Sequence, residues 1–316
     1  MEYKDIHIPV LGKEVVDYLN LKPGDIIFDG TLGGAGHTVE IIKAIAPTGK
    51  VIGVELDSQA ISTATRNLKL KGLTDSVLIV NDNFSNVTEI LKKLSIDKIN
   101  GFLLDLGLSS MQIEMSERGF SYLKNETLDM RFDLAGTIKA SDIINEYTEE
   151  ELRDIFFKFG EERWSGLIAR NIVRQRNITP IEHTGELADI IRHSIPVKFR
   201  FSRKGDPSKR IFQALRIEIN GELDNLEKGL KEGAEALESK ARMAIISYHS
   251  LEDRIVKKSF EKLSGKCTCP QGFPECRCGA TVKAKIITKK ALTASAAEIL
   301  KNPRSKSAKM RVIEKI

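Results

Sequence analysis

Hydrophobic positions in the first third of the chain form short apolar runs separated by segments of helical periodicity. The apolar runs lie at 26–28, 51–54, 77–80 and 101–104, and the helical segments lie at about 38–46, 58–71 (capped by Ser58) and 86–94. Near-continuous apolar strands that alternate with helices are typical of a parallel sheet covered by helices on both faces. We therefore predict an α/β fold with a Rossmann-like, mostly parallel sheet, in which the fourth strand lies beside the first.

The pattern changes in the middle of the chain. Between Met111 and about Phe212 no apolar strand occurs, and helical segments begin at Thr148, which opens a capping box with Glu151, and at Thr184. A block of this kind between strands is typical of an inserted domain. We predict a helical, substrate-recognising insert at 113–212 within a core domain formed by 1–112 and 213–316.

Strand and helix patterns resume after the insert. The sequence predicts a helix at 215–238, a strand at 244–247 and a helix at 251–263, followed by extended runs at 282–288 and 310–316 that close the sheet. The loop between those two runs, 301–309, is basic and rich in small residues, and we expect it to be mobile.

Composition and charge narrow the class of protein. The chain has 316 residues, of which 41% are hydrophobic and 29% charged, an ordinary globular composition. No run of about 18 apolar residues is present, and the N-terminal segment lacks the form of a signal peptide. We therefore expect a cytoplasmic protein without a membrane span. The net charge of +5 indicates a modest preference for polyanions.

Four glycines follow the first apolar run within seven residues, namely Gly30, Gly33, Gly34 and Gly36. A strand, a glycine-rich turn and a helix start bring backbone amides close to a nucleotide-like ligand at the edge of a parallel sheet. The turn lacks the small residue that a dinucleotide fingerprint needs at Val39, and it lacks the lysine of a phosphate-binding loop. A turn whose glycines serve only strand–helix packing is the alternative.

Acidic residues after the strands point to the ligand class. Asp29 in the first turn and Glu55 after the second strand suit a ligand with an amino group and ribose hydroxyls, such as S-adenosylmethionine. Asp105 closes the fourth strand, so its carboxylate is expected in the same crevice, with Gln112 on the loop above it. The alternative for Asp105 is a helix cap. Phe84 either lies against an adenine ring or belongs to the core.

Short motifs spread over the whole chain resemble those of one protein family. They are HIPVL (7–11), DGT (29–31), GAGH (34–37), DLGLSSMQ (105–112), ERGFS (117–121), LDMR (128–131), FGEER (159–163), FQALRI (212–217), SYHSLEDRIVK (247–257) and NPRS (302–305). With these motifs the chain resembles the bacterial 16S ribosomal RNA (cytosine-N4)-methyltransferases.

The resemblance implies a class I S-adenosylmethionine-dependent methyltransferase sheet with a helical insert. It also implies methylation of the exocyclic N4 of a decoding-centre cytosine in 16S rRNA, within the small ribosomal subunit. In that family the cofactor is held at positions that match Ala35, Gly36, His37, Glu55, Phe84, Asp105 and Gln112 here, to which the backbone argument adds Gly34. This chain departs from the family at two of these positions, because the family often has Gly at Ala35 and Asp at Glu55.

The chemistry of an exocyclic amino group makes Asp105 the candidate catalytic residue. Cytosine N4 is a poor nucleophile because its lone pair is delocalised into the ring, and a carboxylate can accept a hydrogen bond from it and align it with the methyl donor. Many amino-methylating enzymes carry Asp/Asn-Pro-Pro-aromatic at this place, and here residues 105–108 replace it. His249 is a candidate contact to the base or a phosphate, with a structural histidine as the alternative.

Two basic stretches are candidates for binding RNA phosphates. One runs from Lys198 through Arg200 and Arg203 to Arg210 with aromatic residues interleaved, and the other comprises residues 301–311. Solvated basic loops are the alternative for both. The target base is expected to leave its stack to reach the methyl donor.

The four cysteines, Cys267, Cys269, Cys276 and Cys278, form a C-x-C-x6-C-x-C pattern. Four thiols in a turn-rich segment of a cytoplasmic protein indicate a metal before disulfides, but zinc sites usually use C-x-x-C pairs. We predict a reduced structural loop without metal, with a zinc site as the alternative.

Two other functions stay open on the sequence. One is a non-catalytic small-subunit assembly or RNA-binding factor that kept the sheet, against which the glycine turn, Glu55 and Asp105 argue. The other is a methyltransferase that acts on another nucleic acid or on a small molecule.

Overall fold

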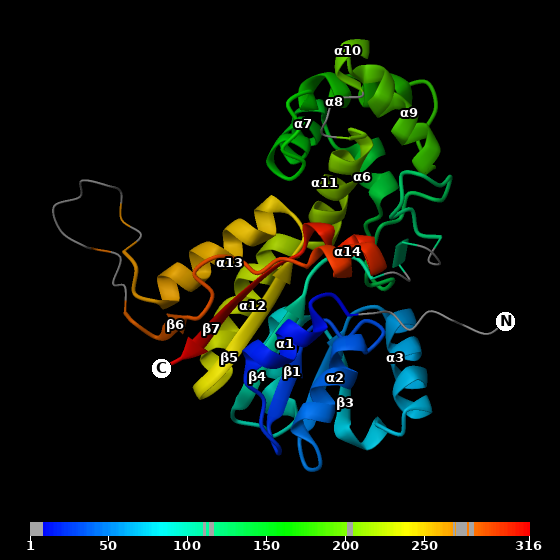
Figure 1. Ribbon diagram of the computed structural model, residues 1–316. Helices are drawn as coiled ribbons and strands as arrows, with labels where there is room; N and C mark the ends of the chain where they lie inside the picture. Colours follow the sequence, from blue (N-terminus) through cyan, green and yellow to red (C-terminus); the bar gives the residue numbers. More distant parts are fainter. Residues whose placement is uncertain are drawn as a thin grey trace. The chain divides into compact units, whose positions relative to one another are not determined.

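The computed structural model describes residues 9–109, 112–113, 117–200, 205–267, 269, 277 and 281–316 (Figure 1). The chain divides into two units. The sheet unit comprises Met1–Gly107 and Leu223–Ile316, and the helical unit comprises Leu108–Glu222. Within the described ranges, no helix is both long and apolar enough to cross a membrane.

The sheet unit is built on a seven-stranded sheet with the order β3-β2-β1-β4-β5-β7-β6. The strands are β1 (Ile26–Asp29), β2 (Lys50–Glu55), β3 (Val77–Asn81), β4 (Ile99–Asp105), β5 (Leu237–Ser247), β6 (Ala284–Ile286) and β7 (Lys309–Lys315). β7 is antiparallel to β5 and β6, and the other pairs are parallel. β1 pairs with both β2 and β4, which confirms the predicted neighbours and makes β1–β4 the point where the strand order reverses.

Helices cover both faces of this sheet, as the continuous apolar strands predict. They are α1 (Gly12–Leu19), α2 (Gly36–Ile45), α3 (Ser58–Leu70), α4 (Val87–Lys93), α12 (Glu222–Ala236), α13 (Ser250–Leu263) and α14 (Ala296–Lys301), with the short 3-10 helices η1 (Thr74–Ser76), η2 (Phe84–Asn86) and η3 (Pro303–Ser307). Alternate strand residues pack on opposite faces. Ile27 and Leu103 belong to the cluster under α1, α2 and α3, whereas Phe28 and Leu104 belong to the cluster under α4, α12 and α13.

The helical unit has a core of its own. Its helices are α6 (Ala140–Glu146), α7 (Glu149–Lys158), α8 (Ser165–Arg176), α9 (Thr184–Ser194), α10 (Val197–Arg200) and α11 (Ser208–Asn220). The capping box predicted at Thr148 is present: its side chain accepts from the Glu151 amide, and Glu151 accepts from the Thr148 amide. Phe156, Ile168 and Leu215 are fully buried together in a third hydrophobic cluster.

The helix predicted at 215–238 is instead two helices. α11 ends at Asn220, and Gly221 follows with φ of 56°, a left-handed conformation that glycine adopts without strain. α12 then begins at Glu222. Because Ile211 and Leu215 of α11 are buried in the core of the helical unit, the boundary lies at 222/223, where the sequence placed it at 212/213. The other boundary lies at 107/108, where the sequence placed it at 112/113.

Two smaller predictions are wrong. The N-cap of α3 is Asp57, whose carboxylate accepts from the Gln59 amide at 3.0 Å, and not Ser58. The loop at 301–309 contains η3, and its Ser305 and Ala308 are buried. Ser305 Oγ donates to the Asn302 carbonyl at 2.8 Å, so this segment is packed and hydrogen-bonded where the sequence predicted mobility.

Two adjacent phenylalanines test the core of the helical unit. Phe156 is fully buried, whereas Phe157 is 67% exposed. We expect Phe156→Ala to lower the free energy of unfolding of this unit by about 3–5 kcal/mol, because it leaves a cavity. Phe157→Ala should change it by less than about 0.5 kcal/mol. Trp164, the one tryptophan of the chain, reports unfolding of this unit by fluorescence in denaturant. Equal effects of the two substitutions would contradict the assigned core.

Candidate functional site

The carboxyl ends of β1, β2 and β4 lie side by side in the middle of the sheet. Asp29 ends β1, and its register partners are Gly53 of β2 and Leu103 of β4. Glu55 and Asp105 end those two neighbouring strands just beyond the partners. Open α/β sheets bind ligands in the crevice where the strand order reverses. Two of the predicted site residues therefore flank the end of β1, at the point where the strand order reverses.

The turn after β1 has the backbone conformation of a glycine-rich loop. Gly33 has φ of 49° and Ala35 has φ of 65°, and α2 begins directly afterwards at Gly36. The Gly33 amide donates to Glu55 Oε2 at 2.9 Å, and Asn67 Nδ2 donates to the Gly34 carbonyl at 3.0 Å. These bonds tie the turn to β2 and α3. The left-handed conformation costs Ala35 roughly 1–2 kcal/mol, a strain that glycine would not carry.

The Glu55 carboxylate is surrounded by backbone amides. Besides Gly33, it accepts from the Leu56 and Asp57 amides at 2.9 and 3.0 Å. A carboxylate offers about four acceptor positions, so these bonds leave one for a ligand hydroxyl. Burial raises the pKa of Glu55, although its hydrogen bonds to the backbone act in the opposite direction.

Asp105 is held from three sides. Tyr248 Oη donates to its Oδ1 at 2.7 Å, and His37 Nε2 lies 3.4 Å from its Oδ2. Its own amide donates to Thr31 Oγ1 at 2.7 Å. The side chain remains 17% exposed. Asp105 is therefore an oriented carboxylate with acceptor positions left for a ligand.

His37 is buried and surrounded by negative charge. Burial lowers the pKa of His37, but the hydrogen bond and charge of Asp105, together with the charges of Asp29 and Glu298, outweigh burial and raise it. Its Nδ1 is buried and has no hydrogen-bond partner among the described residues. The surrounding negative charges thus stabilise the protonated imidazole more than water would.

Asp29 has a structural role. It is only 1% exposed and accepts from Thr38 Oγ1 at 2.6 Å and from the Thr31 amide at 3.3 Å. Burial raises the pKa of Asp29, although its hydrogen bond to Thr38 and the charge of His37 act in the opposite direction. Its burial does not fit the expected contact with a ligand amino group, and Asp29 instead joins the end of β1 to α2.

Phe84 and His249 both take part in packing. Phe84 is partly buried against the core, and a Cβ built on Gly229 of α12 would lie 2.8 Å from its ring. His249 is the N-cap of α13: its Nδ1 accepts from the Glu252 amide at 3.4 Å, and its Nε2 lies 3.1 Å from Glu252 Oε1. The structure therefore shows His249 as a helix cap, and its contact to the base or a phosphate stays a prediction.

The remaining predicted residues are in the helical unit or outside the described ranges. Gln112 belongs to the helical unit and is 6% exposed, and its Oε1 accepts from the Ser109 amide at 3.0 Å. Arg200 ends α10. Arg203, Cys276 and Cys278 lie outside the described residues. The predicted roles of these five residues, zinc binding included, stay predictions.

The basic stretch at 301–311 is partly neutralised. Asp253 of α13 accepts from Arg311 Nε at 2.7 Å and from Lys309 Nζ at 3.2 Å. These bonds lower the pKa of Asp253 in spite of its partial burial, which raises it. Two cations of this stretch are thus engaged within the fold.

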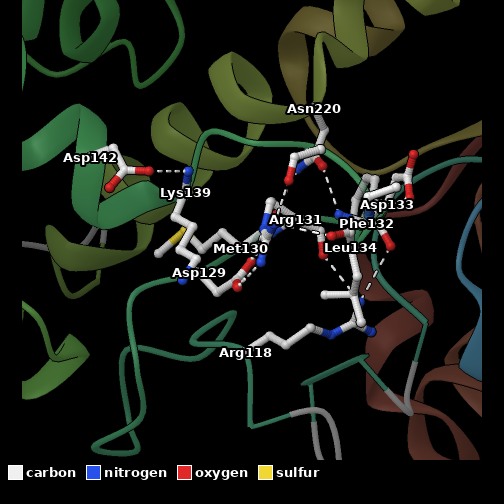
Figure 2. A network of polar contacts seen from close by, with 12 residues as sticks. Arg118, Asp129, Met130, Arg131, Phe132, Asp133, Leu134, Lys139, Asp142 and Asn220 are labelled. Atoms are coloured by element: carbon white, nitrogen blue, oxygen red, sulfur yellow. Dashed lines mark hydrogen bonds and ion pairs between the residues drawn. The ribbon is translucent and has the colours of Figure 1, made fainter.

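Two motifs of the helical unit, at 117–121 and 128–131, hold its own loops (Figure 2). The Arg131 guanidinium donates to both carboxylate oxygens of Asp129, at 2.8 and 2.7 Å. Arg118 Nη1 donates to the Phe132 carbonyl at 3.3 Å, and Asn220 Oδ1 accepts from the Phe132 amide at 2.8 Å. These side chains therefore fix a segment that has no regular secondary structure.

The sequence did not identify Tyr248 or Glu298 as site residues. Tyr248 directly follows β5, the neighbour of β4, and that position is a signal that could have placed it near Asp105. Glu298 accepts from the Leu11 amide at 2.8 Å and adds negative charge around His37. No local pattern predicts the contact between Leu11 and Glu298, because 287 positions separate them.

Comparisons with known proteins place the chain beside one family. A model of the MraW methylase family matches residues 4–316. Ribosomal RNA small subunit methyltransferase H of Clostridium botulinum (strain Loch Maree / Type A3) is 48% identical and covers 100% of both chains. The protein of the same name from Lachnospira eligens is 46% identical over 100% of this chain and 99% of its own. A solved rRNA methylase from Streptococcus thermophilus covers 100% of this chain and 99% of its own, at 10% identity and a TM-score of 0.43.

The charges around His37 can be tested by titration. In cofactor-free protein we expect a His37 pKa above 6.5, and we expect Asp105→Asn to lower it because the amide carries no charge. Because the pKa of His37 is higher in the folded than in the unfolded protein, protonation of His37 stabilises the fold. This contribution is complete below about pH 6.5 and is lost as the pH rises through the His37 pKa of the folded protein. NMR of the imidazole resonances measures the titration. Asp75→Asn, at an exposed site, is the control, and equal His37 pKa values in both variants would contradict the assignment.

Proposed function

The chain belongs to the MraW methylase family, and from this premise we propose that it transfers the methyl group of S-adenosylmethionine to the exocyclic N4 of a cytosine in 16S rRNA. Its sheet is that of a class I methyltransferase. The observation that supports the proposal most is the glycine-rich turn with Glu55 and Asp105 at adjoining strand ends. The name of its relatives refers to the RNA of the small ribosomal subunit. That substrate implies a cytoplasmic protein.

The residues at the strand ends fit S-adenosylmethionine. The remaining acceptor position of Glu55 suits a ribose hydroxyl. Among the described residues, a Cβ built on Gly34 would meet only Asn67 Nδ2 within 4 Å, at 3.8 Å, so a ligand has room to approach the backbone of the turn. In this proposal Ala35, Gly36 and His37 continue that contact surface. The accessible part of Phe84 contacts the adenine ring. The role of Gln112, which belongs to the helical unit, stays a prediction.

Asp105 is the proposed catalytic residue. When bound, S-adenosylmethionine supplies an electrophilic methyl group on a sulfonium. The Asp105 carboxylate accepts a hydrogen bond from the cytosine amino group and so directs N4 toward that methyl group. Formation of the N4–methyl bond would go with cleavage of the methyl–sulfur bond, which leaves a neutral thioether, and the proton that N4 then loses has Asp105 as a nearby acceptor. Tyr248 and His37 are positioning residues, because they hold the two oxygens of this carboxylate.

The basic residues are proposed to bind the RNA substrate. Arg200 and Arg203 are proposed to contact phosphates of the substrate, since phosphate contacts supply most of the affinity for RNA. His249 is a further proposed contact to the base or a phosphate, in addition to its role as the N-cap of α13. The substrate context proposed here is the small ribosomal subunit.

The role of Glu55 can be tested by the affinity for S-adenosylmethionine. Glu55→Gln replaces a carboxylate oxygen with a donor that cannot accept from a ribose hydroxyl. We expect the Kd to rise about tenfold or more, as the loss of a hydrogen bond to a charged group does. Calorimetric titration measures it. Glu40→Gln on α2, where Glu40 pairs with exposed Lys43, is the matched control. An affinity for Glu55→Gln that equals the control would exclude Glu55 as a ligand contact.

The reaction itself is tested on small ribosomal subunits from cells that lack this gene. We expect the protein and S-adenosylmethionine to add a methyl group to N4 of a 16S rRNA cytosine, located by mass spectrometry of nuclease fragments. Asp105→Asn should slow the reaction by about 100-fold or more, as the loss of a positioned proton acceptor does. Subunits left unmethylated by the unmodified protein would favour a non-catalytic assembly factor.

A further inference from the structure

A cluster of cations and aromatic rings lies on the helical unit, formed by Arg163 and Trp164, which directly precede α8, and by Lys198 and Phe199 of α10. Figure 1 labels both helices. The guanidinium carbon of Arg163 lies 4.9 Å from the Trp164 ring centroid and 4.6 Å from that of Phe199. The two ring centroids are 5.6 Å apart, and Lys198 Nζ lies 5.0 Å from the Phe199 centroid. We call these four residues the cation–aromatic cluster.

The cation–aromatic cluster is open to solvent. Arg163 and Lys198 are exposed, and the two rings are partly buried. Arg163, Trp164 and Phe199 line a hollow of about 330 Å³. Flat groups can therefore reach the guanidinium plane and the exposed parts of the rings.

The backbone that carries Arg163 and Trp164 is held from inside the unit. Glu162 is 1% exposed, and its Oε1 accepts from the Trp164 amide at 2.9 Å. Its Oε2 accepts from Arg210 Nε at 2.7 Å. A Cβ built on Gly160 would lie 2.6 Å from the Phe156 carbonyl, so the preceding turn packs closely on α7. A surface held in this way loses little conformational entropy when it binds a ligand.

Arg163 differs in its contacts from four other arginines of the helical unit. Arg131, Arg192, Arg210 and Arg216 of the same unit each form an ion pair with an aspartate or glutamate. The partners of Arg163 in the described part of the chain are two aromatic rings, with no carboxylate within ion-pair distance. Among the described residues, the charge of Arg163 therefore has no acidic partner.

We infer that the cation–aromatic cluster binds an unstacked base of the RNA substrate, with an adjoining phosphate at Arg163 and Lys198. This inference rests on the proposed function, which supplies an RNA with unpaired nucleotides. Proteins recognise splayed bases by stacking them on aromatic rings and arginine planes. A base in a duplex presents no free face, so the ligand is a single-stranded segment. The cluster thus adds a base contact to the phosphate contacts of the basic stretch.

Trp164 provides a direct signal, because it is the one tryptophan of the chain. A single-stranded RNA hexamer titrated into the full chain at low salt should quench its fluorescence, since the base stacks on or beside the indole. An abasic hexamer of equal charge should bind through its phosphates with much less quenching. Equal quenching by the two hexamers would overturn the inference, because it would leave no contact to a base.

Substitutions at Arg163 separate stacking from charge. Arg163→Ala should raise the Kd for the RNA hexamer about tenfold, and Arg163→Lys should restore only part of the affinity, because lysine lacks the planar guanidinium. Arg174→Ala, which removes an exposed arginine from α8, the helix that follows Arg163, is the matched control and should change the Kd by less than about twofold. If Arg163→Ala behaves as Arg174→Ala does, Arg163 only covers the two rings and the inference fails.

Methyl transfer distinguishes this failure from failure of the proposed function. Arg163→Ala should bind S-adenosylmethionine as the unmodified protein does, yet methylate small ribosomal subunits about tenfold less efficiently at limiting substrate. If the unmodified protein transfers no methyl group to RNA, the proposed function fails. If it does so and Arg163→Ala is as efficient as Arg174→Ala, the function stands and the cation–aromatic cluster is not a base site.

Discussion

The need to give each buried carboxylate its hydrogen-bond donors governs the arrangement at the strand ends. A carboxylate taken out of water costs several kcal/mol unless donors replace the lost hydration. Asp29 takes the Thr38 hydroxyl, and Glu55 takes three amides, including that of Gly33. The Gly33 bond joins the turn after β1 to the neighbouring strand. The shape of the glycine-rich turn is therefore set by the acidic end of β2 as much as by its own glycines.

The carboxylates at the strand ends differ in how far each remains accessible to a ligand. Asp29 is 1% exposed and serves the fold alone, whereas Glu55 keeps one position for a ligand. Asp105 is held by Tyr248 and remains partly exposed, which suits a residue that must meet substrate. The helical unit has a different chemistry. Several of its arginines form ion pairs with acidic residues of the same unit. Arg163 instead lies over two aromatic rings.

The architecture of the sheet unit was predictable from local pattern, because buried parallel strands need continuous apolar runs and amphipathic helices need a 3.6-residue period. The break between α11 and α12 at Gly221 was not predictable from local pattern. The periodicity of α11 and α12 is nearly continuous in sequence, and only the burial of Ile211 and Leu215 in a different core separates them. The packed structure of the segment around Ser305 was not predictable either. Burial and hydrogen bonds decide its structure, and its basic composition does not.

The sequence by itself determined the class of sheet, the helical insert, the glycine-rich turn and the family, because each of these is recorded in residues close together along the chain. Only the tertiary structure decided what individual polar side chains do. It gave Asp29 a structural role, and it placed His249 at a helix cap. It also brought Tyr248 to Asp105 across 143 positions and Glu298 close enough for its charge to act on His37. These outcomes depend on which donors and charges meet in space, and spacing along the chain carries no information about partners so far apart.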